Sequence, residues 1–248
     1  MCTVSFLPSN DGFHLAMNRD EQLSRMAALP PEVFTHGALR ALYPHELNGG
    51  TWVGVNEAGL ALALINWYSQ PQSKSGKIAS RGEVIPALLA ADTMVEVGEL
   101  LASLDVGAMN PFRLIVASSR ERSLREWRSS GGALDTVMFP WKRAHWFSSG
   151  FDEAEANRVR GLTCARAARL SQPDSAAWLR KLHASHYPAK GAFSICMHRI
   201  DACTVSCTEL SVNAAAAAMT YSAGPACQRG PRFAKTLRLF PEILCRAA

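Results

Sequence analysis

The order in which strand-like and helix-like segments follow one another constrains the fold of this 248-residue chain more than any other feature. Strand patterns come first, a helical pattern follows, strands return, and further helices precede a last group of strands. Strands and helices thus form separate blocks, which indicates antiparallel sheets covered by helices, whereas a parallel doubly wound sheet requires regular alternation. We expect an α+β fold. Because neither repeats nor linkers interrupt the pattern, we expect one domain over residues 1–248.

Two antiparallel hairpins open the chain, each made of alternating or continuous apolar segments around a turn rich in Asn, Asp and Gly. The paired segments are Cys2–Leu7 with Phe13–Met17, and Thr51–Val55 with Leu60–Ile65. Residues 26–50, between the hairpins, show no periodicity and are predicted to form a loop.

The spacing of apolar residues also predicts the helices and strands of the rest of the chain. Helical spacing of apolar residues extends from Val84 to Leu101 and returns in Asp152–Leu170 and Ser175–His186. The later strands are predicted at Phe112–Ala117, Leu124–Trp127, Ala133–Phe139, Phe193–His198, Thr204–Leu210 and Ala217–Ser222.

Charge and composition exclude several classes of protein. The chain has a net charge of +5 and a basic segment from Gln228 to Ala248, which either faces an anionic ligand or membrane surface or, as we expect, forms a solvated terminal helix. No motif indicates nucleic-acid binding, and the longest apolar stretch is too short to span a bilayer. The seven cysteines lack Cys-x-x-Cys spacing and no secretory leader precedes them, so free thiols and a cytoplasmic location are expected. The oligomeric state does not follow from the sequence.

Cys2 is the first candidate functional residue. Methionine is normally removed before so small a residue, so the mature chain is expected to begin with a cysteine carrying a free thiol and a free α-amine. An α-amine, with a pKa of roughly 7.7–8.0, acts as a general base near neutral pH and activates a terminal nucleophile for acyl transfer. By itself a cysteine at the second position is weak evidence for a catalytic role, because a cysteine in a strand is more often an ordinary core residue.

The first hairpin gives Cys2 candidate partners. If its turn centres on Asn10 and Asp11, paired positions sum to about 21 and Cys2 lies opposite Arg19, within about one residue. A guanidinium there would stabilise a thiolate and hold a substrate carboxylate or carbonyl, and the Asp20 carboxylate would hold the α-amine. The alternative is a surface ion pair at a strand end.

The second hairpin predicts a stabiliser for developing negative charge. Paired positions that sum to about 115 place Asn66 opposite Gly49 and Gly50, close to Trp52. A side-chain amide together with the backbone N–H groups of a glycine pair is a typical oxyanion hole. The alternative is a strand-end asparagine that caps its own turn.

These motifs resemble those of the NRDE family, also called the Transport and Golgi organization protein 2 family. Four early motifs occur in the family's order: Met1-Cys2, Asn18-Arg19-Asp20-Glu21, Gly49-Gly50-Thr51-Trp52-Val53-Gly54 and Arg81-Gly82-Glu83. Ser194–His198 and Thr204–Thr208 are similar to the family's closing strands. The resemblance covers most of the chain and implies a four-layer αββα sandwich of the N-terminal nucleophile (Ntn) hydrolase type, with antiparallel sheets.

The early half also resembles choloylglycine hydrolases and penicillin acylases. This resemblance implies that Cys2 is the nucleophile, that Arg19 and Asp20 are its partners and that Asn66 is an oxyanion donor. The pocket around them is expected to include Asn18, Gly50, Trp52 and Ser149. One departure concerns the last of these. Where the relatives place a Ser-Asn pair before the long helix, this chain has Ser148-Ser149, so the second amide donor is absent or replaced by a hydroxyl.

Two functions follow from the resemblance. NRDE-family members are linked to haem trafficking and to lipid or acyl-CoA handling, which implies a pocket that binds haem or an acyl lipid or acyl-CoA in intracellular trafficking or metabolism. The alternative is Cys2-dependent hydrolysis or transfer of an acyl group from an amide or thioester. No cofactor is required in either case. Haem would be a carried ligand, with Cys2 or a nearby histidine as axial ligand and Arg19 or the basic tail at its propionates.

The later cysteines and histidines match no common metal motif. A pair of histidines, His183 and His186, lies three residues apart on a predicted helix but lacks the acidic partner of a metalloprotease. We therefore expect core cysteines and no metal site. The other residues weighed for such a site are Cys196, His198, Cys203 and Cys207.

Overall fold

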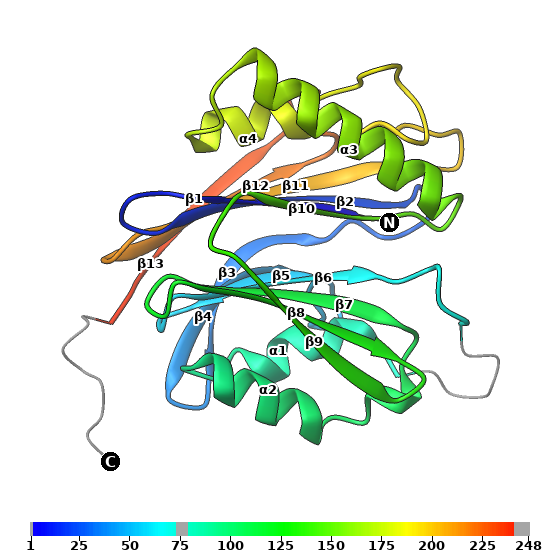
Figure 1. Cartoon of the computed structure of the whole chain (residues 1–248). Coiled ribbons are helices and arrows are strands. Elements are labelled where there is room, and N and C mark those ends of the chain that lie inside the picture. Colours follow the sequence, from blue (N-terminus) through cyan, green and yellow to red (C-terminus); the bar gives the residue numbers. More distant parts are fainter. Residues whose placement is uncertain (1, 73–78, 241–248) are drawn as a thin grey trace.

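The computed structural model describes residues 2–72 and 79–240. Two antiparallel sheets stack face to face, and helices cover the outer surface of each, which gives four layers in the order αββα (Figure 1). The expected α+β fold and its layer order are therefore confirmed. Helices α3 (Glu153–Leu170) and α4 (Ala176–His183) cover one sheet, and α1 (Val84–Leu88) and α2 (Met94–Ser103) cover the other.

Both sheets are antiparallel throughout the described strands. The first sheet has the order β10-β1-β2-β11-β12-β13 and the second runs from β3 to β9 in chain order. The strands of the first sheet are β1 (Cys2–Pro8), β2 (Phe13–Gln22), β10 (Ala144–Ser148), β11 (Ala202–Val212), β12 (Ala216–Ala223) and β13 (Arg232–Arg238). Those of the second are β3 (Leu29–His36), β4 (Leu39–His45), β5 (Val53–Asn56), β6 (Leu60–Asn66), β7 (Phe112–Ser118), β8 (Ser123–Ser130) and β9 (Ala133–Phe139).

Strand β1 divides its side chains between two environments. Cys2, Val4 and Phe6 belong to the apolar core between the sheets. Thr3 and Ser5, one residue out of phase, hydrogen-bond to side chains of α3 and α4 on the opposite face. This alternation places the Cys2 thiol on the inner face of the sheet, at the end of its strand.

The predicted loop over residues 26–50 is wrong, because it contains β3 and β4. Strand β3 is an edge strand, it includes Pro30 and Pro31, and its pairing with β4 shifts register between Leu29 and Glu32. Edge strands tolerate proline and a mostly exposed surface, so they lack the apolar alternation that identifies a strand in sequence.

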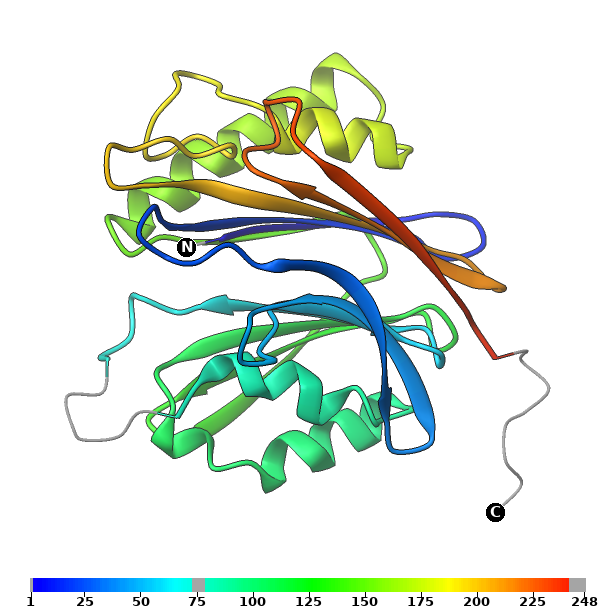
Figure 2. The ribbon, with the colours of Figure 1, turned by 180° about the vertical axis from the view of Figure 1, so that it is seen from behind.

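Two predictions for the later segments are also wrong, and one strand was not predicted. Residues 193–198 form a turn, bends and a single isolated bridge, His198 to Cys203, where a strand was expected. Their backbone polar groups bond instead to the side chains of Asn18, Ser194 and Thr204. The short strand β10 was not predicted. The basic segment forms β13 where a helix was expected; β13 lies beside β3 and β4 at the edge where the two sheets meet, while residues 241–248 lie outside the described residues (Figure 2).

Two histidines lie between the first sheet and its helices, His183 fully buried and His145 partly buried. The His183 ring bonds through Nδ1 to Asn18 Oδ1 (3.1 Å) and through Nε2 to Ser5 Oγ (2.9 Å), and His145 Nδ1 also lies 2.9 Å from that hydroxyl. Burial lowers the pKa of His183 to about 3 and that of His145 to about 4. Both rings are therefore neutral in the folded protein at neutral pH.

The free energy of unfolding is expected to decrease as the pH falls from about 6.5, where histidines titrate in an unfolded chain, towards about 4. Over this range the unfolded chain takes up protons that the folded chain does not, so each buried histidine contributes a slope of up to about 1.4 kcal/mol per pH unit. Urea denaturation at a series of pH values measures this slope, and His183→Gln should flatten it. Stability that stays constant over the same range would contradict the assignment of neutral, buried rings.

Candidate functional site

A cavity of about 290 Å³ opens at the Cys2 end of β1, where the two sheets approach the short helix η1 (Arg81–Glu83). The four residues predicted from sequence to be catalytic all line this one cavity, together with Trp52. They are Cys2, Arg19, Asp20 and Asn66. The other lining residues are Glu21, Arg25, Glu46, Thr51, Leu64, Ala79, Ser80, Arg81, Gly82 and Asn110.

The strand registers explain this convergence. Cys2 pairs with Arg19 across β1 and β2, which is the predicted register, and with Ser148 of β10 on its other side. The second hairpin differs by one residue from the register expected, since Val53 pairs with Ala63. Asn66 is the last residue of β6, so its side chain reaches the cavity from the second sheet.

Cys2 is buried, with 7% of its surface exposed, and its surroundings keep the thiol protonated. Burial raises the pKa of this thiol above its ordinary value, and the negative charge of Asp20 acts in the same direction. The positive charge of the N-terminus, Arg19 and the backbone N–H of Asp20 oppose this rise only in part. At neutral pH the sulfur therefore needs a base at close range before it can act as a nucleophile.

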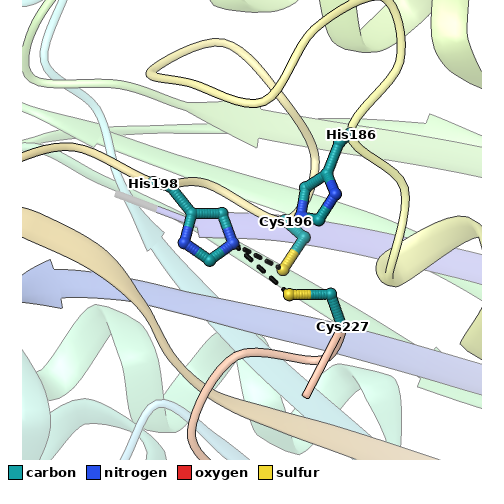
Figure 3. A group of neighbouring side chains, drawn as sticks. All are labelled: His186, Cys196, His198 and Cys227. Atoms are coloured by element: carbon teal, nitrogen blue, oxygen red, sulfur yellow. Dashed lines mark hydrogen bonds between the residues drawn. The ribbon is translucent and has the colours of Figure 1, made fainter.

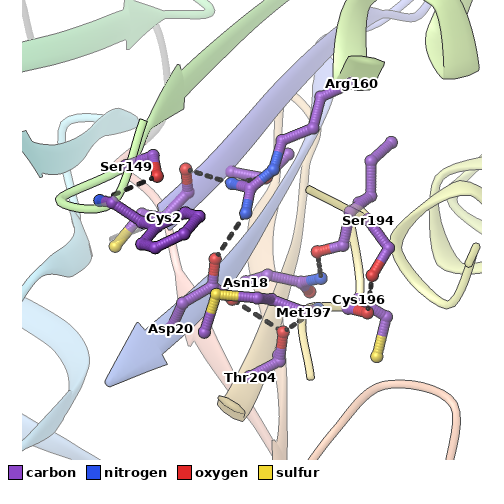
Figure 4. A network of polar contacts seen from close by, with 12 residues as sticks. Cys2, Asn18, Asp20, Ser149, Arg160, Ser194, Cys196, Met197 and Thr204 are labelled. Carbon is purple, nitrogen blue, oxygen red and sulfur yellow. Dashed lines mark hydrogen bonds and ion pairs between the residues drawn. The ribbon is translucent and has the colours of Figure 1, made fainter. Parts of the chain in front are cut away.

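A buried arginine organises the residues behind Cys2 (Figure 4). Arg160, on α3, donates to Asp20 Oδ2 (3.1 Å), to Thr3 Oγ1 (2.9 Å) and to the backbone oxygen of Cys2 (3.2 Å). Thr204 Oγ1 donates to the other Asp20 oxygen at 2.6 Å. Asp20 is thus fixed through both oxygens, and the same guanidinium holds the backbone of the candidate nucleophile.

Arg160 was not predicted as a functional residue. Its helix buries Ala156, Val159, Thr163 and Cys164, and Arg160 falls on the same face, where it is fully buried. An arginine within the apolar stripe of a helix is a detectable signal, because a buried guanidinium requires a carboxylate or several acceptors.

The cavity lining contains three arginines, and they are not equivalent. The Arg19 guanidinium stacks 4.3 Å above the Trp52 ring and forms an ion pair with Glu46, to which Arg25 also binds at 2.9 Å. Arg81 forms no ion pair with any described residue and donates instead to the backbone oxygen of Pro111 (3.0 Å). Burial lowers the pKa of Arg81, but a guanidinium stays charged at neutral pH. It is therefore available to an anionic group in the cavity.

The Asn66 amide nitrogen donates to the Tyr68 hydroxyl at 2.7 Å. Gly50, expected beside Asn66, does not line the cavity. Its N–H donates to Asn48 Oδ1 (3.2 Å), and the N–H of Gly49 donates to the backbone oxygen of Glu46 (2.9 Å). The glycine pair thus shapes the loop, and its N–H groups are used within that loop.

Two further expected pocket residues also lie outside the cavity lining. Asn18 points to the helix side of the sheet, where its amide donates to the backbone oxygens of His183 (2.8 Å) and Ile195 (3.0 Å). Ser149 Oγ accepts from the N–H groups of Phe151 (3.3 Å) and Asp152 (3.4 Å) and so stabilises the start of α3. Both residues support the walls that carry Asp20 and Arg160.

Two stacked antiparallel sheets with helices on both outer surfaces are the fold of the Ntn hydrolases. Solved structures of that class superpose on most of the chain. A mutant conjugated bile acid hydrolase from Clostridium perfringens has a TM-score of 0.59 at 10% identity over 95% of this chain and 92% of its own. Penicillin V acylase from Agrobacterium tumefaciens has a TM-score of 0.55 at 12% identity over 94% of this chain and 85% of its own. At these identities the likeness establishes the fold alone.

The family follows from the sequence match. The model of the Transport and Golgi organisation 2 family matches residues 1–155, and the chain belongs to that family. No curated protein matches the chain. Among the described residues, no helix has the length and apolar character needed to cross a bilayer.

Proposed function

We propose that this protein is a Cys2-dependent hydrolase or acyltransferase acting on the amide or thioester bond of a small acyl compound that carries a negative charge. The observation that supports this most is the meeting of Cys2, Arg19, Asp20 and Asn66 in one cavity with Arg81, whose guanidinium has no ion-pair partner among the described residues. A nucleophile, a fixed carboxylate, an amide donor and an anion-binding group are the parts that acyl transfer requires.

In the proposed reaction the α-amine of the mature Cys2 accepts the thiol proton, and the sulfur then attacks the substrate carbonyl. The carbonyl oxygen becomes an oxyanion, for which Asn66 lies on the facing wall. Collapse of this intermediate breaks the C–N or C–S bond, the α-ammonium protonates the leaving amine or thiol, and a thioester remains on Cys2. Water, or an acceptor amine or alcohol, then attacks the thioester and restores the thiol.

The supporting residues set the geometry of these steps. Arg160 and Thr204 orient the Asp20 carboxylate, and Asp20 lies next to the residue whose amine is the proposed base. Arg81 binds the anionic group of the substrate, and a cavity of about 290 Å³ limits its size. This volume is at the lower end of the range of about 300–1,000 Å³ for small-molecule sites.

A second candidate function is reversible binding of an acyl compound without turnover. Two observations favour it: the raised pKa of the Cys2 thiol, and the Asn66 amide nitrogen that already donates to Tyr68. Haem fits the cavity less well than a small acyl anion, because the described lining is largely polar and contains no histidine. Turnover separates the two functions. A panel of acyl amides and acyl thioesters, with and without a carboxylate, should give Cys2-dependent product release in the enzyme and saturable binding alone in the carrier.

The proposed base exists only if the mature chain begins at Cys2. We expect intact-protein mass spectrometry of the purified protein to show the mass of residues 2–248. A variant in which Met1 is retained, obtained by a bulky residue inserted after it, should bind substrate normally and turn it over far more slowly, because its amine is displaced from the sulfur. Full activity of the protein with Met1 retained would contradict the terminal-amine mechanism.

A further inference from the structure

Four potential metal ligands gather outside the cavity, on the segment that follows α4 and on the β12–β13 turn. The residues are His186, Cys196, His198 and Cys227, and their ligand atoms all lie within 4.8 Å of one another. Figure 3 shows the His198 ring beside the two thiols, with one ring nitrogen facing both sulfur atoms. Its Nε2 atom lies 3.6 Å from the Cys196 sulfur and 3.4 Å from the Cys227 sulfur.

These distances match the edges of a tetrahedral zinc site. Zinc binds sulfur at about 2.3 Å and imidazole nitrogen at about 2.0–2.1 Å, so that two ligands at a tetrahedral angle lie roughly 3.6 Å apart. The His186 ring completes the set, with its centroid 5.0 Å from that of His198. His186 Nε2 is buried and has no hydrogen-bond partner among the described residues, which leaves it free for a ligand.

The four residues come from distant parts of the chain and belong to no common zinc-binding spacing. Cys196 is fully buried and His186 and His198 are partly buried, whereas Cys227 is exposed and closes the group from the solvent side. A metal held by all four would tie the 186–198 segment to the β12–β13 turn.

We propose that His186, Cys196, His198 and Cys227 form a structural site for a divalent soft or borderline metal ion, with zinc as the expected occupant. Two thiolates and two imidazoles in tetrahedral reach are the donor set that zinc prefers, and four protein ligands leave no open position for catalysis. On binding, both thiols lose their protons to solvent. This proposal replaces the expectation from sequence that the chain has no metal site.

The site is connected to Asp20 through the backbone next to Cys196 (Figure 4). The Met197 N–H donates to Thr204 Oγ1 at 2.8 Å, and the same hydroxyl donates to Asp20 at 2.6 Å. Asn18 holds the carbonyl of Ile195, on the other side of Cys196. A metal that fixes this segment would therefore also fix the position of the Asp20 carboxylate.

The test uses untagged, full-length protein, purified under reducing conditions, with its metal content measured by mass spectrometry. We expect one zinc ion per chain, and we expect Co²⁺ added to the metal-free protein to give the visible spectrum of a tetrahedral thiolate site. Cys227→Ser is the main variant because Cys227 is exposed, so its folding is not at risk. Its zinc affinity should fall by more than the roughly 10–100-fold that loss of an outer-shell partner costs.

Cys203→Ser is the matched control, since Cys203 is partly buried on the adjacent strand β11 but does not belong to the group. It should bind zinc as the wild type does. A chelator should lower the Tm of the wild type and of this control, and leave that of Cys227→Ser unchanged. Absence of zinc and of the Co²⁺ spectrum in the reduced wild type would overturn the proposal. So would a Cys196–Cys227 disulfide with no metal uptake after its reduction, or equal losses in both variants.

Discussion

Cys2→Ala is expected to abolish turnover, with a loss on the order of 10⁶-fold in kcat if the sulfur is the nucleophile. The substitution removes a single sulfur atom from a buried position, so it should cost only about 1 kcal/mol of stability. Substrate binding should persist, because Arg19 and Arg81 are untouched. Steady-state kinetics and calorimetry on the same preparation separate the two effects.

Cys203→Ala provides the comparison, because Cys203 lies on β11 and does not line the cavity. Its turnover should equal that of the wild type. If Cys2→Ala retains turnover, the sulfur does not form a covalent intermediate. If wild type and Cys2→Ala bind the same acyl anion and neither releases product, the protein is a carrier.

Arg160→Met is expected to destabilise the fold by about 3–5 kcal/mol, because it removes one partner of a fully buried ion pair, the Arg160 guanidinium that contacts the Asp20 carboxylate. The methionine fills similar space, so the loss reports the uncompensated charge and not a cavity. Urea denaturation measures this loss as a shift of the transition midpoint. Asp20→Asn in the Arg160→Met background should recover part of the stability, since the buried charge is then removed.

Arg158→Ala is the matched control on the same helix. Arg158 is exposed and pairs with Glu155 one turn earlier, and such pairs contribute at most about 0.5 kcal/mol. Equal losses for Arg158→Ala and Arg160→Met would contradict the role assigned to the buried pair.

The first hairpin shows why part of the site could be predicted from sequence. Side chains alternate with a period of two along a strand, and a short turn at Asn10 and Asp11 leaves few possible registers. The pairing of Cys2 with Arg19 follows from these two constraints. The register predicted for the second hairpin differs by one residue from the observed one, but it still places Asn66 at the correct end of its strand.

Contacts between distant segments could not be derived in this way. Arg160 reaches Asp20 from a helix that follows it by 140 residues, and nothing in a local pattern sets that distance. The same holds for Cys227, which meets His198 only after β11 and β12 have formed a hairpin. The edge strand β3 was missed for a different reason, since its exposed, proline-containing segment has no apolar period to detect.

In the proposed reaction Cys2 carries an acyl group during turnover. The direct measurement mixes enzyme with an acyl thioester, quenches it in acid within the first turnover, and locates any added mass by peptide mapping. Acid keeps the α-amine protonated, so the acyl group stays on sulfur and remains sensitive to neutral hydroxylamine. We expect a hydroxylamine-sensitive adduct on the peptide that begins at Cys2, absent from Cys2→Ala. Turnover with no adduct on Cys2, or with the adduct on another residue, would contradict the proposed reaction.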